Sequence, residues 1–182
     1  HVAARPIEMN DNLYALLAAR FPQNPDAPCL ILPDGRRVSY GELESRSAQY
    51  GNMLIQAGLK PGDRVAAQVE KSPEALFLYL GCLRAGGVFL PLNPAYQRGE
   101  VVYFLDDAKP GLFVCRPEKL EEAQELAWAA RVPLVHDLGE RGEIDQLEHR
   151  VGRRLDPHEL GGRPDRRLHR RRLWRRRRGR PT

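Results

Sequence analysis

Residues 64–94 read RVAAQVEKSPEALFLYLGCLRAGGVFLPLNP, and this stretch decides the fold. Arg64 to Val69 is short and rich in valine and alanine, and a Pro-Gly-Asp turn precedes it, so we predict a strand. Val88 to Leu92 is a second short apolar run and is also predicted to be a strand. A helical segment joins the two. Strand, helix and strand with short joints predict a parallel βαβ unit with a right-handed crossover.

The segment between the two strands carries helix signals at both of its ends. Ser72 offers a hydroxyl to the first free N–H groups, Pro73 stands at the first helical position, and Glu74 places a negative charge in the first turn. The helix should end at about Ala85, because Gly86-Gly87 can adopt the left-handed conformation of a C-terminal cap. The helix is apolar on nearly every side, so we expect both its own sheet and a further layer to cover it.

Upstream of this unit, the pattern predicts a helix, a hairpin and a second helix. The first helix, Asn12 to Phe21, carries three leucines at helical spacing: Leu13, Leu16 and Leu17. Cys29 to Tyr40 contains an Asp-Gly turn between two short runs and predicts a β-hairpin. Gly41 to Ala57 repeats apolar residues at helical spacing and is followed by Gly58, which predicts an amphipathic helix with a glycine stop.

Downstream of Pro94, helices and strands continue to alternate. Gly99 to Ala108 has the stripe Val102 and Leu105 of a short helix, and Glu118 to Ala130 predicts a helix with a strongly acidic face. Two strands are predicted between and after these helices: Gly111 to Cys115 and Pro133 to His136. This alternation predicts an α/β fold with a largely parallel sheet and flanking helices.

Length and composition restrict the class of protein. The chain has 182 residues, of which 42% are hydrophobic, which suits about one globular domain. No long apolar run suggests a membrane span. The chain begins with His1 and has no charged-then-apolar leader, so we expect neither a signal peptide nor a native start. Its three cysteines are widely spaced in apolar surroundings, which favours reduced thiols in the cytoplasm: Cys29, Cys82 and Cys115.

Several spaced motifs resemble one enzyme family. Residues 61–66 (PGDRVA) and 84–94 (RAGGVFLPLNP) look like the N-terminal part of the AMP-forming acyl-CoA synthetases, in the adenylate-forming superfamily. Residues 38–43 (VSYGEL) match that family's strand-to-helix entry, and residues 102–110 (VYFLDDAKP) resemble its next helix and turn. Residues 70–76 (EKSPEAL), 78–80 (LYL) and 93–96 (NPAY) are most similar to malonyl-CoA synthetases. The resemblance covers about Asn12 to His136.

The resemblance implies a two-step ligase. A carboxylate, here malonate, attacks the α-phosphate of Mg-ATP, and the thiol of coenzyme A then displaces AMP. The intact parent enzyme would therefore use ATP, Mg²⁺ and CoA, and would be linked to fatty acid metabolism. The family's phosphate loop reads Ser-Gly-Thr-Thr-Gly-x-x-Lys-Gly, and this sequence has no such run. The family's adenine pocket, carboxylate-binding arginines and C-terminal lysine lie beyond the match. We therefore assign no catalytic, cofactor-binding or metal residue, and expect no bound cofactor.

Four features that could suggest a site have simpler interpretations. Lys71-Ser72 before a helix resembles a phosphate site, but an ordinary N-cap beside a solvated lysine explains it better. Gly86-Gly87 follows a helix, so it is a helix stop rather than a nucleotide loop. Glu118 to Glu125 is interpreted as a solvated helix face. The histidines share no metal spacing and are interpreted as surface or tail residues: His136, His149, His158 and His169.

The character of the sequence changes near residue 140. Residues 1–140 hold 14 Lys and Arg against 18 acids, whereas residues 141–182 hold 15 Arg against 6 acids. The tail binds nucleic acid in one interpretation, since arginines neutralise phosphates, although only Trp174 could supply stacking. In the other, favoured interpretation it is an out-of-frame translation of a GC-rich gene. Its charge density predicts disorder in either case.

These observations predict two parts and one function. Residues 1–140 are a partial N-terminal subdomain of an AMP-binding ligase, and residues 141–182 are the arginine-rich tail. The chain is expected to be an N-terminal fragment of a cytoplasmic acyl-CoA synthetase, inactive alone, with no membrane partner and with non-specific association through an exposed core. Two alternatives stay open: a non-catalytic α/β interaction module, and a basic-tailed nucleic-acid-binding protein.

Overall fold

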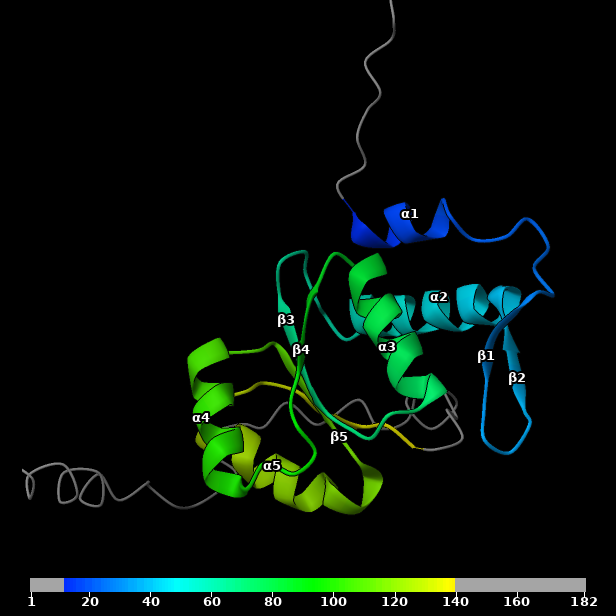
Figure 1. The fold of residues 1–182 in the computed structure, drawn as a ribbon. Coiled ribbons are helices and arrows are strands. Elements are labelled where there is room, and N and C mark those ends of the chain that lie inside the picture. Colours follow the sequence, from blue (N-terminus) through cyan, green and yellow to red (C-terminus); the bar gives the residue numbers. More distant parts are fainter. Residues whose placement is uncertain (1–11, 140–182) are drawn as a thin grey trace, which may run out of the picture.

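The computed structural model describes residues 12–139, and the predictions made for residues 1–11 and 140–182, the tail included, lie outside the described residues. Its centre is a four-stranded parallel sheet with the strand order β4-β3-β5-β6 (Figure 1). The strands are β3 (Arg64–Gln68), β4 (Val88–Pro91), β5 (Leu112–Cys115) and β6 (Val135–Asp137). In the centre of this sheet, Val65 pairs with Phe89 of β4 on one side and with Leu112 of β5 on the other.

The predicted βαβ unit is present with the caps expected from the sequence. Helix α3 (Pro73–Arg84) joins β3 to β4, and the Ser72 hydroxyl accepts a hydrogen bond from the Ala75 backbone N–H at 3.1 Å. At the other end Gly86 has a φ of +74°, which favours glycine, and the Gly87 N–H donates to the Cys82 carbonyl at 2.9 Å. These contacts end the helix and turn the chain into β4.

The helices form layers on both faces of the sheet, and each layer has its own apolar core (Figure 1). Successive residues of β3 alternate between the layers: Val65 packs with α3, whereas Ala66 packs with the opposite layer. The opposite layer contains α4 (Arg98–Ala108) and α5 (Leu120–Ala129), which follows the short 3₁₀ helix η1 (Pro117–Lys119). The sheet is therefore covered on both faces, as a parallel sheet requires.

The second cover predicted for α3 is α2 (Tyr40–Gln56), with α1 (Leu13–Ala18) alongside. The two long helices approach so closely that a Cβ atom on Gly81 of α3 would lie 2.6 Å from the Cβ atom of Tyr50 in α2. Only glycine allows this approach. Much of the apolar surface of α3 is thus covered within this chain, while Leu76, Tyr79 and Leu83 are only partly buried.

The hairpin is confirmed, and it lies apart from the main sheet. Its strands β1 (Pro28–Ile31) and β2 (Arg37–Ser39) pair antiparallel. In the turn, Gly35 has a φ of +84° and the Asp34 carboxylate accepts the Arg36 N–H at 2.9 Å. Ser39 then caps α2 by accepting the Glu42 N–H at 3.1 Å, so hairpin and helix follow one another without a linker.

The two shorter helices are present where helical spacing predicted them, but the residues that they bury differ in part from the predicted stripes, and the last strand is shifted. Leu13 and Leu16 in α1 are 46% and 49% exposed, and Tyr14 is the residue of that helix that is buried. In α4, Val101 lies in the core and Val102 is only partly buried. The last strand was expected from Pro133 to His136 but runs as β6, Val135–Asp137. Helical spacing gives the period of the apolar residues, but it does not say which side of the helix the protein covers.

Among residues 12–139, no helix combines the length and apolar character that crossing a membrane would need.

Candidate functional site

The candidate site is the edge of the sheet where β3 and β5 end. Helix α3 leaves β3 along one face of the sheet, and α5 follows β5 along the other face. The loops after these two neighbouring parallel strands therefore diverge. Such a switch point, outside the carboxyl ends of the strands, is where open α/β sheets form ligand crevices. Two cavities open here, one on each face.

Arg116 lies between the two cavities and lines both. Its Nη1 atom is 3.0 Å from a carboxylate oxygen of Glu70, in the loop after β3, and its Nε atom is 3.3 Å from a carboxylate oxygen of Glu118. The Arg116 side chain is 30% exposed, so solvent weakens these pairs. The contacts nevertheless tie the loop after β3 to the loop after β5, across the crevice.

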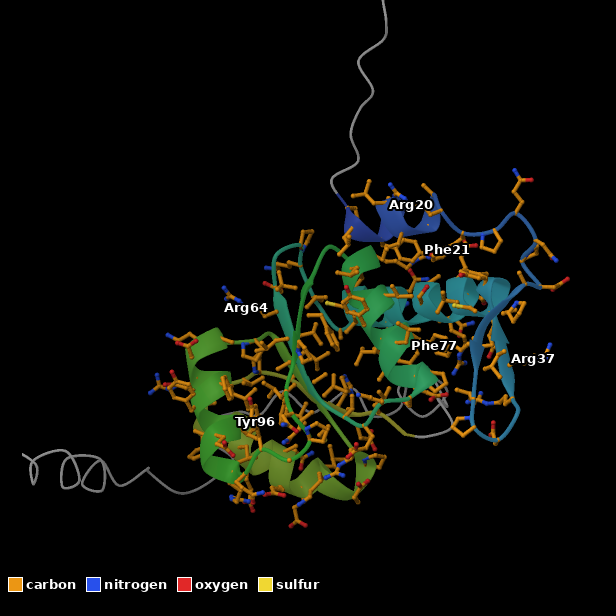
Figure 2. The ribbon with its side chains drawn as sticks, in the orientation of Figure 1. Arg20, Phe21, Arg37, Arg64, Phe77 and Tyr96 are labelled. Carbon is orange, nitrogen blue, oxygen red and sulfur yellow. The ribbon has the colours of Figure 1, made fainter. Side chains whose placement is uncertain are left out.

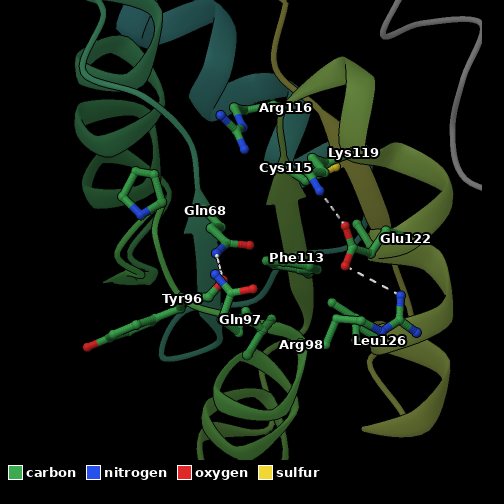
Figure 3. Close-up of a pocket in the computed structure, with 13 residues that line it drawn as sticks. Gln68, Tyr96, Gln97, Arg98, Phe113, Cys115, Arg116, Lys119, Glu122 and Leu126 are labelled. Carbon is green, nitrogen blue, oxygen red and sulfur yellow. Dashed lines mark hydrogen bonds and ion pairs between the residues drawn. The ribbon is translucent and has the colours of Figure 1, made fainter.

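The smaller cavity, of about 160 Å³, lies on the α4 and α5 face (Figure 3). Gln68, the last residue of β3, donates from Nε2 to the carbonyls of Asn93 and Tyr96, each at 3.1 Å. These two hydrogen bonds hold the loop from β4 to α4 against the end of β3. The aromatic ring of Tyr96, labelled with other side chains in Figure 2, then stacks on Phe104, with centroids 5.1 Å apart, and fixes that loop on α4.

Each cation that lines the smaller cavity already has an acidic partner. Arg98 contacts Glu125 at 2.7 Å. Glu122 contacts Arg98 at 3.4 Å and Lys119 at 2.7 Å (Figure 3). The hydrogen bond to Glu125 raises the pKa of Arg98, and the hydrogen bond from Lys119 lowers the pKa of Glu122. A phosphate would have to compete with these carboxylates, so this cavity does not fit a triphosphate.

The larger cavity, of about 620 Å³, lies on the α3 face. Its walls come from the hairpin turn, the loop from β3 to α3, the start of η1 and the residues after β6: Leu32, Pro33, Asp34, Arg36, Val69, Glu70, Lys71, Ser72, Pro73, Glu74, Arg116, Pro117, Glu118, Leu138 and Gly139. Most of its charged side chains are exposed, but Glu74 is only 4% exposed. The loop from β3 to α3 contains no glycine, and the Ser72 hydroxyl is occupied by the helix cap, so this cavity has no phosphate loop either.

The thiols and the histidine of this region are not prepared for catalysis. Burial raises the pKa of Cys115 to about 12 and that of Cys82 to about 11, so both thiols keep their protons at neutral pH. Burial also lowers the pKa of His136, which keeps its imidazole neutral. Within the described part of the chain, no group of three or more His, Cys, Asp or Glu side chains could hold a metal ion.

Most of the simpler interpretations agree with the structure. Ser72 is an N-cap beside the exposed Lys71, and Gly86 is part of a helix stop. The acidic face of α5 is largely solvated and ion-paired, with Glu125 60% exposed. The interpretation of His136 as a surface or tail residue was wrong: it is 4% exposed in β6, and its Nδ1 atom has no hydrogen-bond partner among residues 12–139. His149, His158 and His169 lie outside residues 12–139.

Sequence reasoning missed the roles of Glu74 and Arg116. Glu74 was interpreted only as a first-turn charge, and its burial was not expected. Arg116 pairs with a residue 46 positions away, which no local pattern reveals. A usable signal was present, because both residues follow the carboxyl ends of predicted parallel strands.

Comparison with known proteins gives a family match over most of the chain. A family described as "AMP-binding enzyme" matches residues 17–165, which extends past the resemblance noted between Asn12 and His136. Among curated proteins, bacitracin synthase 3 of Bacillus licheniformis is 36% identical over 94 residues, which is 52% of this chain and 2% of that protein. Tyrocidine synthase 1 of Brevibacillus parabrevis is 26% identical over 143 residues, covering 79% of this chain and 12% of that protein.

Solved structures also match this chain over most of its length. MatB from Rhodopseudomonas palustris is 42% identical with a TM-score of 0.70, and the match covers 77% of this chain and 28% of that chain. The ATP-bound form of that protein matches with a TM-score of 0.69. An acyl-CoA synthetase from Brucella canis is 28% identical with a TM-score of 0.53, over 62% of this chain and 21% of that one. This chain therefore spans only a small part of each of these proteins.

Proposed function

The chain belongs to the AMP-binding enzyme family, and we propose that it is the N-terminal part of an AMP-forming acyl-CoA synthetase that activates malonate. The parent enzyme joins the malonate carboxylate to the α-phosphate of ATP, with release of pyrophosphate, and then transfers the malonyl group to the thiol of CoA. The three free cysteines of the chain favour a cytoplasmic location, where thiols stay reduced.

One observation carries this proposal: the 42% identity with MatB over 77% of the chain. The other acyl-CoA synthetase compared above is 28% identical. The sequence EKSPEAL at residues 70–76, which first suggested malonyl-CoA synthetases, forms the loop after β3 and the start of α3. It lies at the carboxyl edge of the sheet, where α/β enzymes place their ligand-contacting loops.

The role of residues 12–139 in this proposal is to provide a scaffold. Adenylation needs N–H groups and a cation around the α-phosphate. The cations of the smaller cavity are paired with carboxylates, and Arg36 and Lys71, which line the larger cavity, are exposed to solvent. The sheet and its two helix layers would support the catalytic loops of the remaining sequence. We therefore expect no malonate-dependent ATP–pyrophosphate exchange from this chain alone.

A chimera tests the proposal. Residues 12–139 would replace the matching segment of MatB, and exchange of labelled pyrophosphate into ATP would be measured with malonate. We expect exchange within about tenfold of that of MatB, because one unit of the parent fold is replaced by a homologous one. Exchange with malonate omitted gives the background.

The control is the same chimera with Gly81→Leu, which places a side chain where α2 and α3 touch. This variant should lose both the cooperative melting transition and the exchange. A chimera that melts cooperatively like MatB but gives no exchange above background would contradict the proposal. Exchange by the 182-residue chain alone would contradict the scaffold role.

A further inference from the structure

The larger cavity lies where the described part of the chain ends. Gly139, the last described residue, lines this cavity. Leu138 lines it as well, is 8% exposed and belongs to the apolar core on the α3 face. The chain continues from this point through residues 140–182. The sequence that follows Gly139 therefore starts at the wall of the cavity.

The β6 end of the sheet lacks a helix of its own on this face. Among residues 12–139, the elements that contact β6 extensively are its neighbour β5 and, on the other face, α5. The cavity walls offer apolar surface from three separate segments, and two of the side chains are only partly buried: Leu32 and Val69, with Leu138 as the third. Parallel sheets are covered on both faces, so a further apolar element is expected here.

The sequence that follows has the pattern of such an element. Residues 144–155 read IDQLEHRVGRRL, and the apolar residues at positions 144, 147, 151 and 155 fall on one side of a helix. Arginines follow in the last turn, where they suit the helix dipole, and Pro157 stands just beyond the end. The AMP-binding family match continues through residue 165, so this segment belongs to the same family sequence as the sheet.

The connection from the cavity wall to this segment is short. Residues 140–143 separate Gly139 from Ile144, and an extended chain of that length spans at most about 18 Å. A short tether of this kind gives the segment a high effective concentration at the cavity, so modest apolar contacts are enough to hold it there. The cavity, of about 620 Å³, has room for more than one large side chain.

We infer that residues 144–155 form a helix that docks on the larger cavity, with Ile144, Leu147, Val151 and Leu155 against its apolar wall. This docking removes apolar surface of both the helix and the wall from water. The folded unit then extends at least to residue 155, and the disorder expected of the tail begins later. The larger cavity is then part of the fold and not a ligand site, whichever acid the parent enzyme activates.

Methyl NOEs measured on the full chain, labelled at its Ile, Leu and Val methyl groups, test the docking directly. We expect NOEs from Ile144, Leu147 or Val151 to Val69 or Leu138. A mixture of two differently labelled samples separates contacts within one chain from contacts between two copies. The absence of NOEs between the segment and the cavity wall, or NOEs found only between copies, would overturn the inference.

Leu147→Asp tests the same contact by amide hydrogen exchange, again in the full chain. The substitution places a charge on the apolar side of the segment, so the amides of residues 144–155 should exchange at least about tenfold faster than in the unmodified chain. That factor is the one that burial of a single leucine side chain contributes. Equal exchange of these amides in the two proteins would contradict the docking.

The matched control is Gln146→Asp, which introduces the same carboxylate one position away, on the opposite side of the proposed helix. Its segment amides should exchange within about twofold of those in the unmodified chain, as expected of a surface substitution. Both substitutions lie outside residues 12–139, so the sheet and its helices keep their sequence. Equally fast exchange in the two variants would show that the apolar side makes no special contact and would also overturn the inference.

Discussion

Leu78 and Leu83 lie on the same helix but differ in burial. The sequence predicted that α3 is covered on both sides, but the structure shows Leu83 only partly buried, whereas Leu78 is 1% exposed. Leu78→Ala should therefore reduce the free energy of unfolding by about 2–5 kcal/mol, through lost burial and a cavity. Leu83→Ala should reduce the free energy of unfolding by distinctly less. Urea titration of both variants gives the comparison, and equal losses would show that α3 is buried on its outer side as well.

His136 gives the fold a predictable dependence on pH. Burial lowers the pKa of His136 in the folded state, so at mildly acidic pH the unfolded chain binds more protons at this position than the folded chain. The contribution of the neutral imidazole to stability is therefore complete above the unfolded pKa of about 6.5. It is lost progressively as the pH falls from there toward the lowered folded pKa.

We predict that lowering the pH from 7.5 to 5.5 reduces the free energy of unfolding of the His136→Leu variant by less than that of the unmodified chain. Urea midpoints at the two pH values measure this difference, and the carboxylates common to both proteins cancel in the comparison. Parallel pH profiles for the two proteins would show that His136 is solvated in the folded state.

At the scale of elements, local signals determined what could be predicted. The turn glycine, the N-cap Ser72 and the N1 residue Pro73 act within a few positions along the chain, so the βαβ unit followed from the sequence. The exposure of the α1 leucines could not be predicted from the sequence, because Tyr14 packs against the core in their place. The guanidinium of Arg84 lies 4.2 Å from the centre of the Tyr14 ring. The cavities at the carboxyl edge of the sheet could not be predicted either, because contacts between residues far apart in the sequence shape them. The Arg116–Glu70 ion pair, for example, joins residues 46 positions apart.

The packing of α2 on α3 depends on one glycine. A methyl group at Gly81 would lie 2.6 Å from the Tyr50 Cβ atom and 2.8 Å from the Gly51 nitrogen, and backbone atoms cannot move aside cheaply. Gly81→Ala should therefore destabilise the fold by about 1–3 kcal/mol, the usual cost of overpacking.

Gly99→Ala is the matched control for this packing prediction. Gly99 lies in helix α4, and no heavy atom lies within 4 Å of the position that an added methyl group would take, so alanine should be neutral or stabilising by about 0.4–1 kcal/mol. Thermal melts of both variants decide the point. If the Gly81→Ala protein is as stable as the Gly99→Ala protein, then α2 and α3 do not approach closely enough at Gly81 to exclude a methyl group.

The whole molecule exposes apolar surface that a complete parent enzyme would be expected to cover. Val88, at the start of the edge strand β4, is 49% exposed, and Tyr103 on α4 is 66% exposed. Edge strands and apolar patches of this kind promote association. We predict that the chain binds a hydrophobic dye and associates as its concentration rises, by light scattering. A monomer that binds no dye at high concentration would favour the alternative of a self-sufficient interaction module.

The arginine-rich sequence from residue 141 onward has two explanations, and the gene distinguishes them. From Gly161 to Thr182, 11 of the 22 residues are arginine. If that sequence is an out-of-frame translation, one of the other two frames past codon 140 should encode a Ser-Gly-Thr-Thr-Gly loop. The protein expressed from the restored frame should then exchange pyrophosphate into ATP with malonate and much less with acetate. If both frames contain only stops and patternless sequence, the out-of-frame explanation is wrong. Salt-dependent nucleic-acid binding by the arginines then becomes the measurement to make.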